Sequence, residues 1–424
     1  MRWARADFTR VPAALLLVAG VALMLRSAAP MDPGIDYFTD ASPSIDALVR
    51  GDLPAFFAQH SLMGPVSLLL RAPFVGLCFH GSLDAVYFAG VLPCVAAVVA
   101  CVWALRRRMA ALGRPAAAIT LVSVVALVNP GVFRSIHWGH PEELLGAALC
   151  VGAVLAALRD RTVAAALLLG LAVATKQWAV IAVVPTLLAA SRRRLPLLLG
   201  AGAIAAAFMA PAVLAAPSAF VDLHKEVAVA GGPVSPPNVW FPFSEPRPEA
   251  ERALSVSGFA FQIPAWLSGL THPAIVMAGI PLGLLFWRRR RQLARDDALG
   301  LLALLLLLRC MLDPWNNDYY HAPFLLALLA WEAIARGGWP RMTVFAGAAL
   351  ALTFPAHLDS MTAISAEPLR YCAGYLVWAL PLTGWLGLSL FAPARAAAIA
   401  AAVRARIAGG GALTWLAHER ATRS

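Results

Sequence analysis

Long apolar runs separated by short polar segments are the dominant pattern of this chain. About 20 apolar residues cross a bilayer as a helix, and shorter runs fit broken helices. The pattern predicts about twelve transmembrane or re-entrant helices, and the fold class is therefore an all-α polytopic membrane protein. The segments lie near residues 11–29, 82–105, 115–132, 142–158, 162–175, 178–190, 195–216, 272–287, 297–312, 321–335, 341–356 and 372–391.

Composition agrees with this pattern and excludes other classes. Of 424 residues, 60% are hydrophobic and only 13% are charged, whereas ordinary globular chains carry about 25% charged residues. The formal net charge is +11, but the arginines form short clusters between apolar runs instead of one solvated face, which argues against nucleic-acid binding. The six cysteines lack metal-ligand spacing and are expected to be small buried hydrophobes.

The arginine clusters predict the topology, because positive charge beside membrane segments marks the cytoplasmic side. With the segments above, the clusters at 106–114, 159–161, 192–194, 288–295 and 336–341 and the arginine-rich end of the chain fall on one side together with the N-terminus. We expect a multi-pass protein of a bacterial plasma membrane with both termini cytoplasmic. Residues 1–391 then form the transmembrane domain, and residues 392–424 form a basic cytoplasmic tail.

Chemistry is expected on the outer face, where the longer loops hold most of the acidic, His and aromatic residues. The first of these loops, residues 30–62, contains Asp36 beside Tyr37 and Phe38, aromatics that can sit at headgroup level and raise the basicity of the carboxylate by desolvation. Asp40 is the rival if the loop is helical, because it would share a face with Asp36. The second, residues 217–271, is rich in Pro, Gly and Trp and is interpreted as a lid or substrate-facing loop.

Lys176 lies between two apolar runs that are each too short to cross a bilayer. It is one of only two lysines in the chain, and Gln177 and Trp178 follow it. A cation at that depth requires an anionic partner. Either Lys176 snorkels at a helix end, or it binds a phosphate or carboxylate in a hairpin that spans or re-enters the membrane.

A second group of polar residues falls in the outer turn between residues 129 and 143. Arg134, His137 and His140 are candidates for phosphate contact, whereas Glu142 and its neighbour Glu143 could equally cap a helix N-terminus. The two histidines lack the helical spacing that would favour a metal site.

A third group surrounds Arg309, which lies inside an apolar run and must pair with Asp313 or with a lipid phosphate. Aromatic residues and a histidine follow it, and their types fit either a membrane interface or a substrate site. They are Trp315, Tyr319, Tyr320 and His321.

Over residues 11–391 the chain resembles the GT-C integral-membrane glycosyltransferases, in particular the bacterial branch of family eighty-seven that uses polyprenyl-phosphate sugars. The resemblance is carried by an outer-loop Asp followed by Ala47–Asp52, by Gly139–Glu142, by the Gly170–Trp178 hairpin and by Asp313–His321.

The resemblance implies an inverting transfer of a hexose, with mannose favoured, or of a pentose to a lipid, polysaccharide or protein acceptor. The base is an Asp of the first outer loop, which falls on Asp36. Relatives often have Tyr-Tyr after this Asp where this chain has Tyr37-Phe38, so Asp40 stays an alternative. No nucleotide cofactor is implied, and a divalent metal ion remains possible.

By the same resemblance, the cationic side chains would hold the donor phosphate and their neighbours would contact the substrates. The donor set is Lys176, Arg134, His137, His140 and Arg309, and the substrate set is Gln177, Trp178, Glu142, Trp315, Tyr319, Tyr320 and His321. Two other classes fit the same sequence: a transporter or flippase for a lipid-linked sugar or other anion, and a non-catalytic assembly scaffold.

Overall fold

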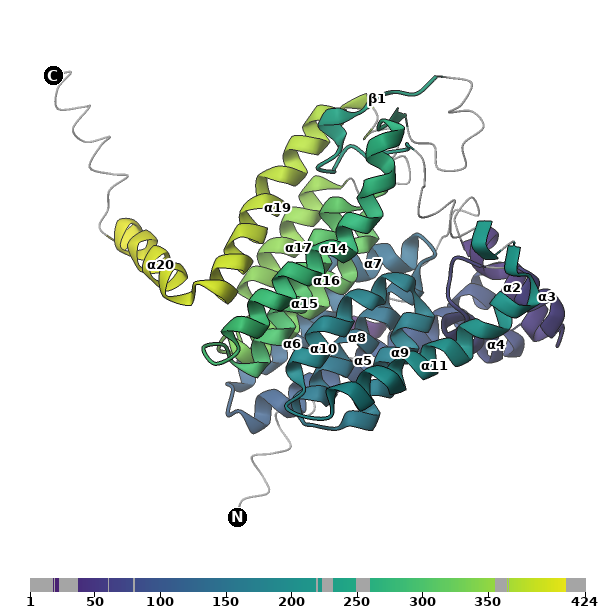
Figure 1. Cartoon of the computed structure of the whole chain (residues 1–424), viewed down its shortest axis with the longest axis horizontal. Coiled ribbons are helices and arrows are strands. Elements are labelled where there is room, and N and C mark those ends of the chain that lie inside the picture. Colours follow the sequence, from purple (N-terminus) through teal and green to yellow (C-terminus); the bar gives the residue numbers. More distant parts are fainter. Residues whose placement is uncertain are drawn as a thin grey trace, which may run out of the picture.

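A computed structural model describes residues 18, 20–22, 37–59, 61–78, 81–218, 220–222, 232–248, 260–354, 364 and 366–408. Within these residues the fold is almost entirely helical, which confirms the predicted all-α polytopic class (Figure 1). Its helices are η1 (Tyr37–Ala41), α2 (Ser42–Val49), α3 (Leu53–Ala58), α4 (Pro65–Leu77), α5 (Leu83–Ala111), α6 (Ala116–Val128), α7 (Pro130–His137), α8 (Pro141–Leu158), α9 (Thr162–Thr175), η2 (Gln177–Ala182), α10 (Val183–Ala189), α11 (Arg194–Ala215), η3 (Phe241–Phe243), α14 (Ala265–Arg289), η4 (Arg295–Asp297), α15 (Ala298–Leu312), η5 (Asp318–Tyr320), α16 (His321–Ala335), α17 (Arg341–Thr353), α19 (Pro368–Phe391) and α20 (Pro393–Ala408).

Six of the described helices are long and apolar enough to cross a membrane: Leu83–Ala111, Ala116–His137 (α6 continued by α7), Pro141–Leu158, Arg194–Ala215, Ala265–Arg289 and Pro368–Phe391. Shorter apolar helices accompany them, including α9 and the combined η2 and α10. At a rise of 1.5 Å per residue, the 14 residues of α9 span about 21 Å, less than the hydrocarbon core of about 30 Å. The chain therefore reverses at Lys176 between two helices that are each too short to cross the core.

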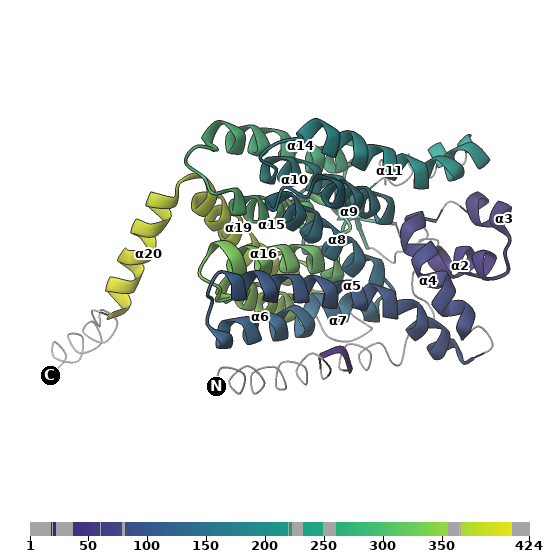
Figure 2. The same cartoon turned by 90° about the horizontal axis from the view of Figure 1, so that it is seen from below.

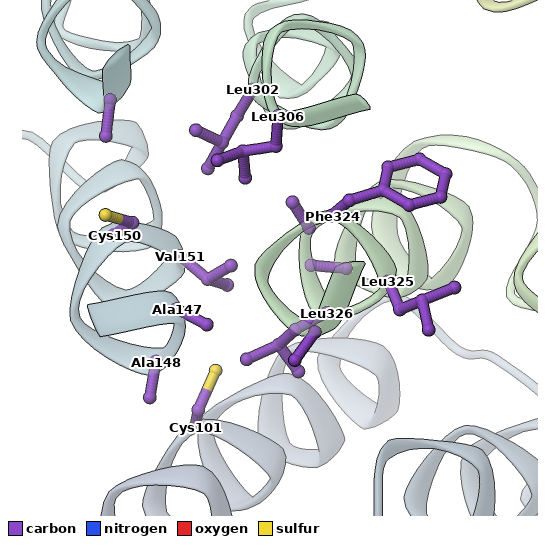
Figure 3. Packing of buried hydrophobic residues seen from close by; sticks show 14 of the residues in the cluster. Cys101, Ala147, Ala148, Cys150, Val151, Leu302, Leu306, Phe324, Leu325 and Leu326 are labelled. Atoms are coloured by element: carbon purple, nitrogen blue, oxygen red, sulfur yellow. The ribbon is translucent and has the colours of Figure 1, made fainter. Parts of the chain in front are cut away.

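The core of the bundle lies where α8, α15 and α16 pack together, with α5 beside them. Figure 3 shows Ala147 and Val151 of α8 facing Leu306 of α15 and Leu326 of α16. Small residues on α8 let the neighbouring backbones approach closely. Gly300 allows a similar approach, since a Cβ there would lie 2.6 Å from the indole of Trp331. All six cysteines are free and five are buried, as expected for small hydrophobes.

Two short helices of the loop that was predicted to lie outside, α2 and α3, lie with α4 at one end of the bundle (Figures 1 and 2). At the opposite end of the chain, α20 continues from α19 but points away from the bundle in both views.

Part of the second loop predicted to lie outside, residues 217–271, is fixed to the bundle. Strands β1 (Glu245–Pro246) and β2 (Phe261–Gln262) pair antiparallel. The Ser235 amide donates to the Pro314 carbonyl at 2.8 Å, and the Trp240 indole donates to the Leu312 carbonyl at 2.6 Å. The described part of the loop is therefore anchored on the end of α15, and whether the loop acts as a lid stays a prediction.

Candidate active site

Two adjacent glutamates at the first turn of α8 form the centre of the site. Gly139 has a φ of +82°, which glycine adopts without strain, and Pro141 begins the helix. Glu142 and Glu143 follow and are 0% and 1% exposed. The positive end of the α8 dipole favours carboxylates here, as the capping interpretation requires. Burial this complete also demands cationic partners.

Glu142 is held by three basic side chains from separate parts of the chain. Its Oε1 lies 2.8 Å from His140 Nδ1 and 3.1 Å from Lys176 Nζ. Its Oε2 lies 3.8 Å from Nη1 of Arg71, a residue of α4 that is fully buried. Lys176 therefore has a carboxylate partner within the protein, and the middle of α4 meets the start of α8 and the end of α9 at this point.

Glu143 is bound from the other direction. Its Oε1 accepts a hydrogen bond from the Trp178 indole at 3.1 Å and lies 3.9 Å from Lys176 Nζ, while its Oε2 lies 3.4 Å from Arg309 Nη1. The Arg309 guanidinium also packs against the rings of Trp178 and Tyr320, 4.8 Å and 4.5 Å from their centroids. The expected ion-pair partner of Arg309 was Asp313 or a lipid phosphate, and the structure places Glu143 in that position.

Charge in this cluster is nearly balanced. Three permanent cations, Arg71, Lys176 and Arg309, face the two glutamates, so one positive charge is in excess before His140 and the first outer loop are counted. Asp40 of η1 is close enough for its charge to act on Lys176. Asp40, when ionised, would offset this excess charge.

Of the two candidate bases in the first loop, only Asp40 belongs to the residues that the structure describes. Asp40 is half-buried, and its carbonyl accepts a hydrogen bond from the Ser61 hydroxyl. Asp36 lies outside the described residues. Its neighbour Tyr37 is buried against the Arg71 guanidinium, 5.2 Å from the ring centroid, and burial raises the pKa of the Tyr37 hydroxyl while Arg71 opposes the rise.

A second polar group adjoins the glutamates through ring stacking. His140 stacks on Tyr319 of η5, with centroids 4.2 Å apart and planes 16° from parallel. The residue before it, Asp318, forms an ion pair with Arg134 of α7. Burial raises the pKa of the Asp318 carboxyl, and the Arg134 guanidinium opposes the rise. The predicted turn at 129–143 and the predicted segment at 309–321 therefore meet.

Three other predicted site residues, Gln177, His321 and Trp315, have surroundings that differ from those of the glutamate cluster. Gln177 is exposed, whereas His321 is fully buried and its Nε2 lies 3.1 Å from the Tyr375 hydroxyl. His321 Nδ1 lies 3.2 Å from the carbonyl oxygens of Asn317 and Asp318, so it braces the η5 turn. Trp315 is half-buried and its amide donates to Asp313 at 3.0 Å.

Two residues of the cluster were not identified as site residues from the sequence. Arg71 interrupts the apolar run between residues 64 and 79, and Glu143 was expected only as a possible helix cap. Arg71 has Nε and Nη2 atoms that are buried without a hydrogen-bond partner among the described residues, and Glu142 Oε2 is in the same condition. A buried arginine in an apolar run was the signal for this site, because such a charge is costly without a function.

Pockets flank the cluster on both sides. A narrow one of about 30 Å³ is lined by Gln177, Ser61, Ser44 and apolar residues of α3, α4 and α11. A larger one of about 380 Å³ has Arg134, His137 and Asp318 among apolar walls. It shares Ala351 and Phe354 with a third pocket of about 520 Å³ between α17 and α19. Within the described residues, no three His, Cys, Asp or Glu side chains are arranged to hold a metal ion.

The chain was compared with models of known protein families. The model of glycosyltransferase family 87 matches residues 62–314, which contain Arg71, both glutamates, Lys176 and Arg309. No curated protein matches the chain.

Proposed function

The chain belongs to glycosyltransferase family 87 and is a membrane glycosyltransferase, and we propose that it transfers a sugar from a polyprenyl-phosphate donor to an acceptor hydroxyl at the outer face of the membrane. The proposed transfer is inverting, and mannose is the favoured sugar. The acceptor is a lipid, polysaccharide or protein.

The observation that carries the choice of donor is the combined groove between α7, α17 and α19. One end holds Arg134, His137 and Asp318, and most of the other lining residues are apolar, including Phe345, Leu352 and Val377; Thr353 and Arg370 are polar exceptions. A polyprenyl phosphate has the same arrangement, an anionic head on an apolar chain. The groove therefore fits a lipid-linked donor better than a water-soluble nucleotide sugar.

The charge balance of the cluster supports the proposed reaction. The acceptor oxygen bonds to the anomeric carbon, the bond from that carbon to the phosphate oxygen breaks, and the hydroxyl proton passes to a carboxylate. The donor phosphodiester becomes a monoester with one more negative charge. If Asp40 takes the proton, the cluster around Lys176 gains one positive charge in the same step, which stabilises the departing phosphate.

Asp36 and Asp40 are both proposed for the role of the base. Asp40 is supported by the effect of its charge on Lys176 and by its hydrogen bond from Ser61, which lines the narrow pocket. Asp36 is supported by the family resemblance. Lys176, Arg134, His137, His140 and Arg309 are proposed to neutralise the donor phosphate.

Sugar transfer by the purified protein in nanodiscs tests this proposal. Radiolabelled polyprenyl-phosphate mannose is offered with a membrane glycolipid extract, and wild type is compared with Asp36→Asn and Asp40→Asn. Loss of general-base catalysis lowers turnover by about 10²- to 10⁴-fold, and we expect this loss in one of the two variants. The proposal is supported if a labelled product forms with the wild type and is lost in the variant that lacks the base.

Asp52→Asn is the matched control, because it changes a carboxylate of the same loop whose role is visible. Asp52 caps α3 by accepting from the Ala55 amide at 3.0 Å, and asparagine caps a helix equally well. Full turnover in both Asp36→Asn and Asp40→Asn would contradict a first-loop base. Donor binding without transfer under any acceptor would favour a transporter or flippase.

A further inference from the structure

Two arginines at the end of the bundle remote from the glutamates converge on one tryptophan. Arg194 begins α11 and Arg290 follows α14, and their guanidinium carbons lie 4.5 Å and 3.9 Å from the ring of Trp287. Trp287 is 38% exposed. Guanidinium groups stack on aromatic faces, but two cations on one ring repel each other unless an anion lies nearby.

Carboxylates do not supply that anion in the part of the chain that the structure describes. Neither Arg194 nor Arg290 forms an ion pair there; Arg194 Nε instead donates to the Leu187 carbonyl at 2.8 Å. Two acidic residues of this region, Asp160 and Asp297, instead pair with other arginines. Asp160 lies 3.1 Å from Arg295, and Asp297 lies 3.4 Å from Arg336.

The surface beside this tryptophan is apolar and continuous along α14. Met277, Ile280, Leu284 and Trp287 recur at helical spacing on one face, and the first three are 58%, 49% and 55% exposed. On α11, Leu195, Leu198 and Leu199 are also exposed. Both helices pack on α10 and lie along the same edge of the bundle (Figure 2).

We propose that Arg194 and Arg290, on either side of Trp287, bind the phosphate headgroup of an anionic phospholipid whose acyl chains follow the exposed apolar faces of α11 and α14. Arginines at a membrane surface are expected for topology alone. Topology does not require two of them on one indole at the head of an apolar stripe, whereas clustered basic residues beside transmembrane helices do bind anionic lipid headgroups. The site is separate from the glutamate cluster and does not depend on the donor.

Quenching of Trp287 by brominated lipids tests the proposal. The full-length protein is placed in nanodiscs that contain dibrominated phosphatidylglycerol or, at the same content, dibrominated phosphatidylcholine. The difference between wild type and Trp287→Phe isolates the signal of this indole. We expect brominated phosphatidylglycerol to quench Trp287 more strongly than brominated phosphatidylcholine. This preference should fall about fivefold for each arginine that is replaced, first in Arg290→Gln and then in Arg194→Gln/Arg290→Gln.

Arg107→Gln/Arg108→Gln is the control, since it removes the same charge from another arginine cluster. If this variant keeps the preference for quenching by phosphatidylglycerol, the result supports a defined lipid site at Trp287. Equal quenching by the two lipids, or an equal loss in the control, would overturn the proposal. Millimolar inorganic phosphate must fail to compete; full competition would show a site for free phosphate instead of lipid. Arg290→Gln alone keeps the test valid if Arg194→Gln fails to fold, because Arg194 also binds the end of α10.

Discussion

Basic residues are buried and paired with carboxylates at one end of the bundle, whereas at the other end they are more exposed and stack on a tryptophan. Around the glutamates of α8, Arg71 and Arg309 are 0% and 4% exposed, and each lies within 4 Å of a carboxylate. Around Trp287, Arg290 is exposed and stacks on the indole without a carboxylate partner among the described residues.

The difference follows from the cost of burying charge. A guanidinium taken out of water loses several kcal/mol of hydration free energy, which only close partners and hydrogen bonds restore. An arginine at a membrane surface keeps its water and can attract lipid phosphates. Buried charge therefore marks the end that holds the candidate active site, and exposed charge marks the end that is proposed to bind lipid headgroups.

Glu142→Gln should have the largest effect on this comparison. It leaves Lys176, Arg71 and His140 around a neutral amide, and breaking a buried ion pair from one side costs about 3–5 kcal/mol. We expect a marked loss of thermal stability in detergent together with loss of sugar transfer. Glu367→Gln removes half of the exposed pair with Arg370 and should leave the melting temperature unchanged. Similar melting temperatures for the two variants would contradict the idea that buried ion pairs stabilise the protein and exposed ones do not.

Gly64→Ala should have the next largest effect. A Cβ at Gly64 would lie 2.3 Å from the Ala174 carbonyl oxygen and 2.8 Å from the Thr175 backbone, just before Lys176. Overpacking of this kind costs about 1–3 kcal/mol and should separate α4 from α9, which lowers transfer as well. The control is Gly279→Ala on α14, where nothing lies within 4 Å of the new methyl group.

Alanine at Gly279 should preserve or raise the melting temperature, because it favours the helix. If Gly279→Ala destabilised the protein as strongly as Gly64→Ala, close packing would not be particular to the glutamate end.

Trp178→Phe should have a moderate effect. It removes the indole donor to Glu143 Oε1 but retains an aromatic ring beside Arg309. Loss of a hydrogen bond to a charged group costs about 1.5–3 kcal/mol, and transfer should fall while the protein remains folded. Thermal unfolding and turnover, measured on one preparation, check this result. Unchanged values in both would show that Lys176 and Arg309 suffice to hold Glu143.

Arg290→Gln should have the smallest effect on stability and none on transfer in detergent. The guanidinium is exposed and its described contact is with Trp287. We expect an unchanged melting temperature in detergent, with a difference appearing only in anionic lipid. A large loss of stability in detergent would place Arg290 among the structural contacts of the bundle.

The local pattern of apolar and polar residues along the chain predicted most of the helices. The expected segments 142–158, 162–175, 195–216 and 321–335 agree with α8, α9, α11 and α16 to within one residue at each end. Apolar length, prolines and charged residues act within a few residues of each other, so these boundaries are readable from the sequence. The site was harder to predict, because Arg71 and Glu142 belong to separate helices and contact each other only after the helices have packed.

The sequence by itself determined that this protein is an all-α membrane protein, where its helices break, and that Lys176 and Arg309 need anionic partners, since each follows from local hydrophobicity and the cost of buried charge. The tertiary structure decided which partners they have. Packing of α4, α9 and α15 around the first turn of α8 brings Arg71, Lys176 and Arg309 to Glu142 and Glu143. Those contacts join residues up to 166 positions apart, and only the arrangement of the helices in space can select them.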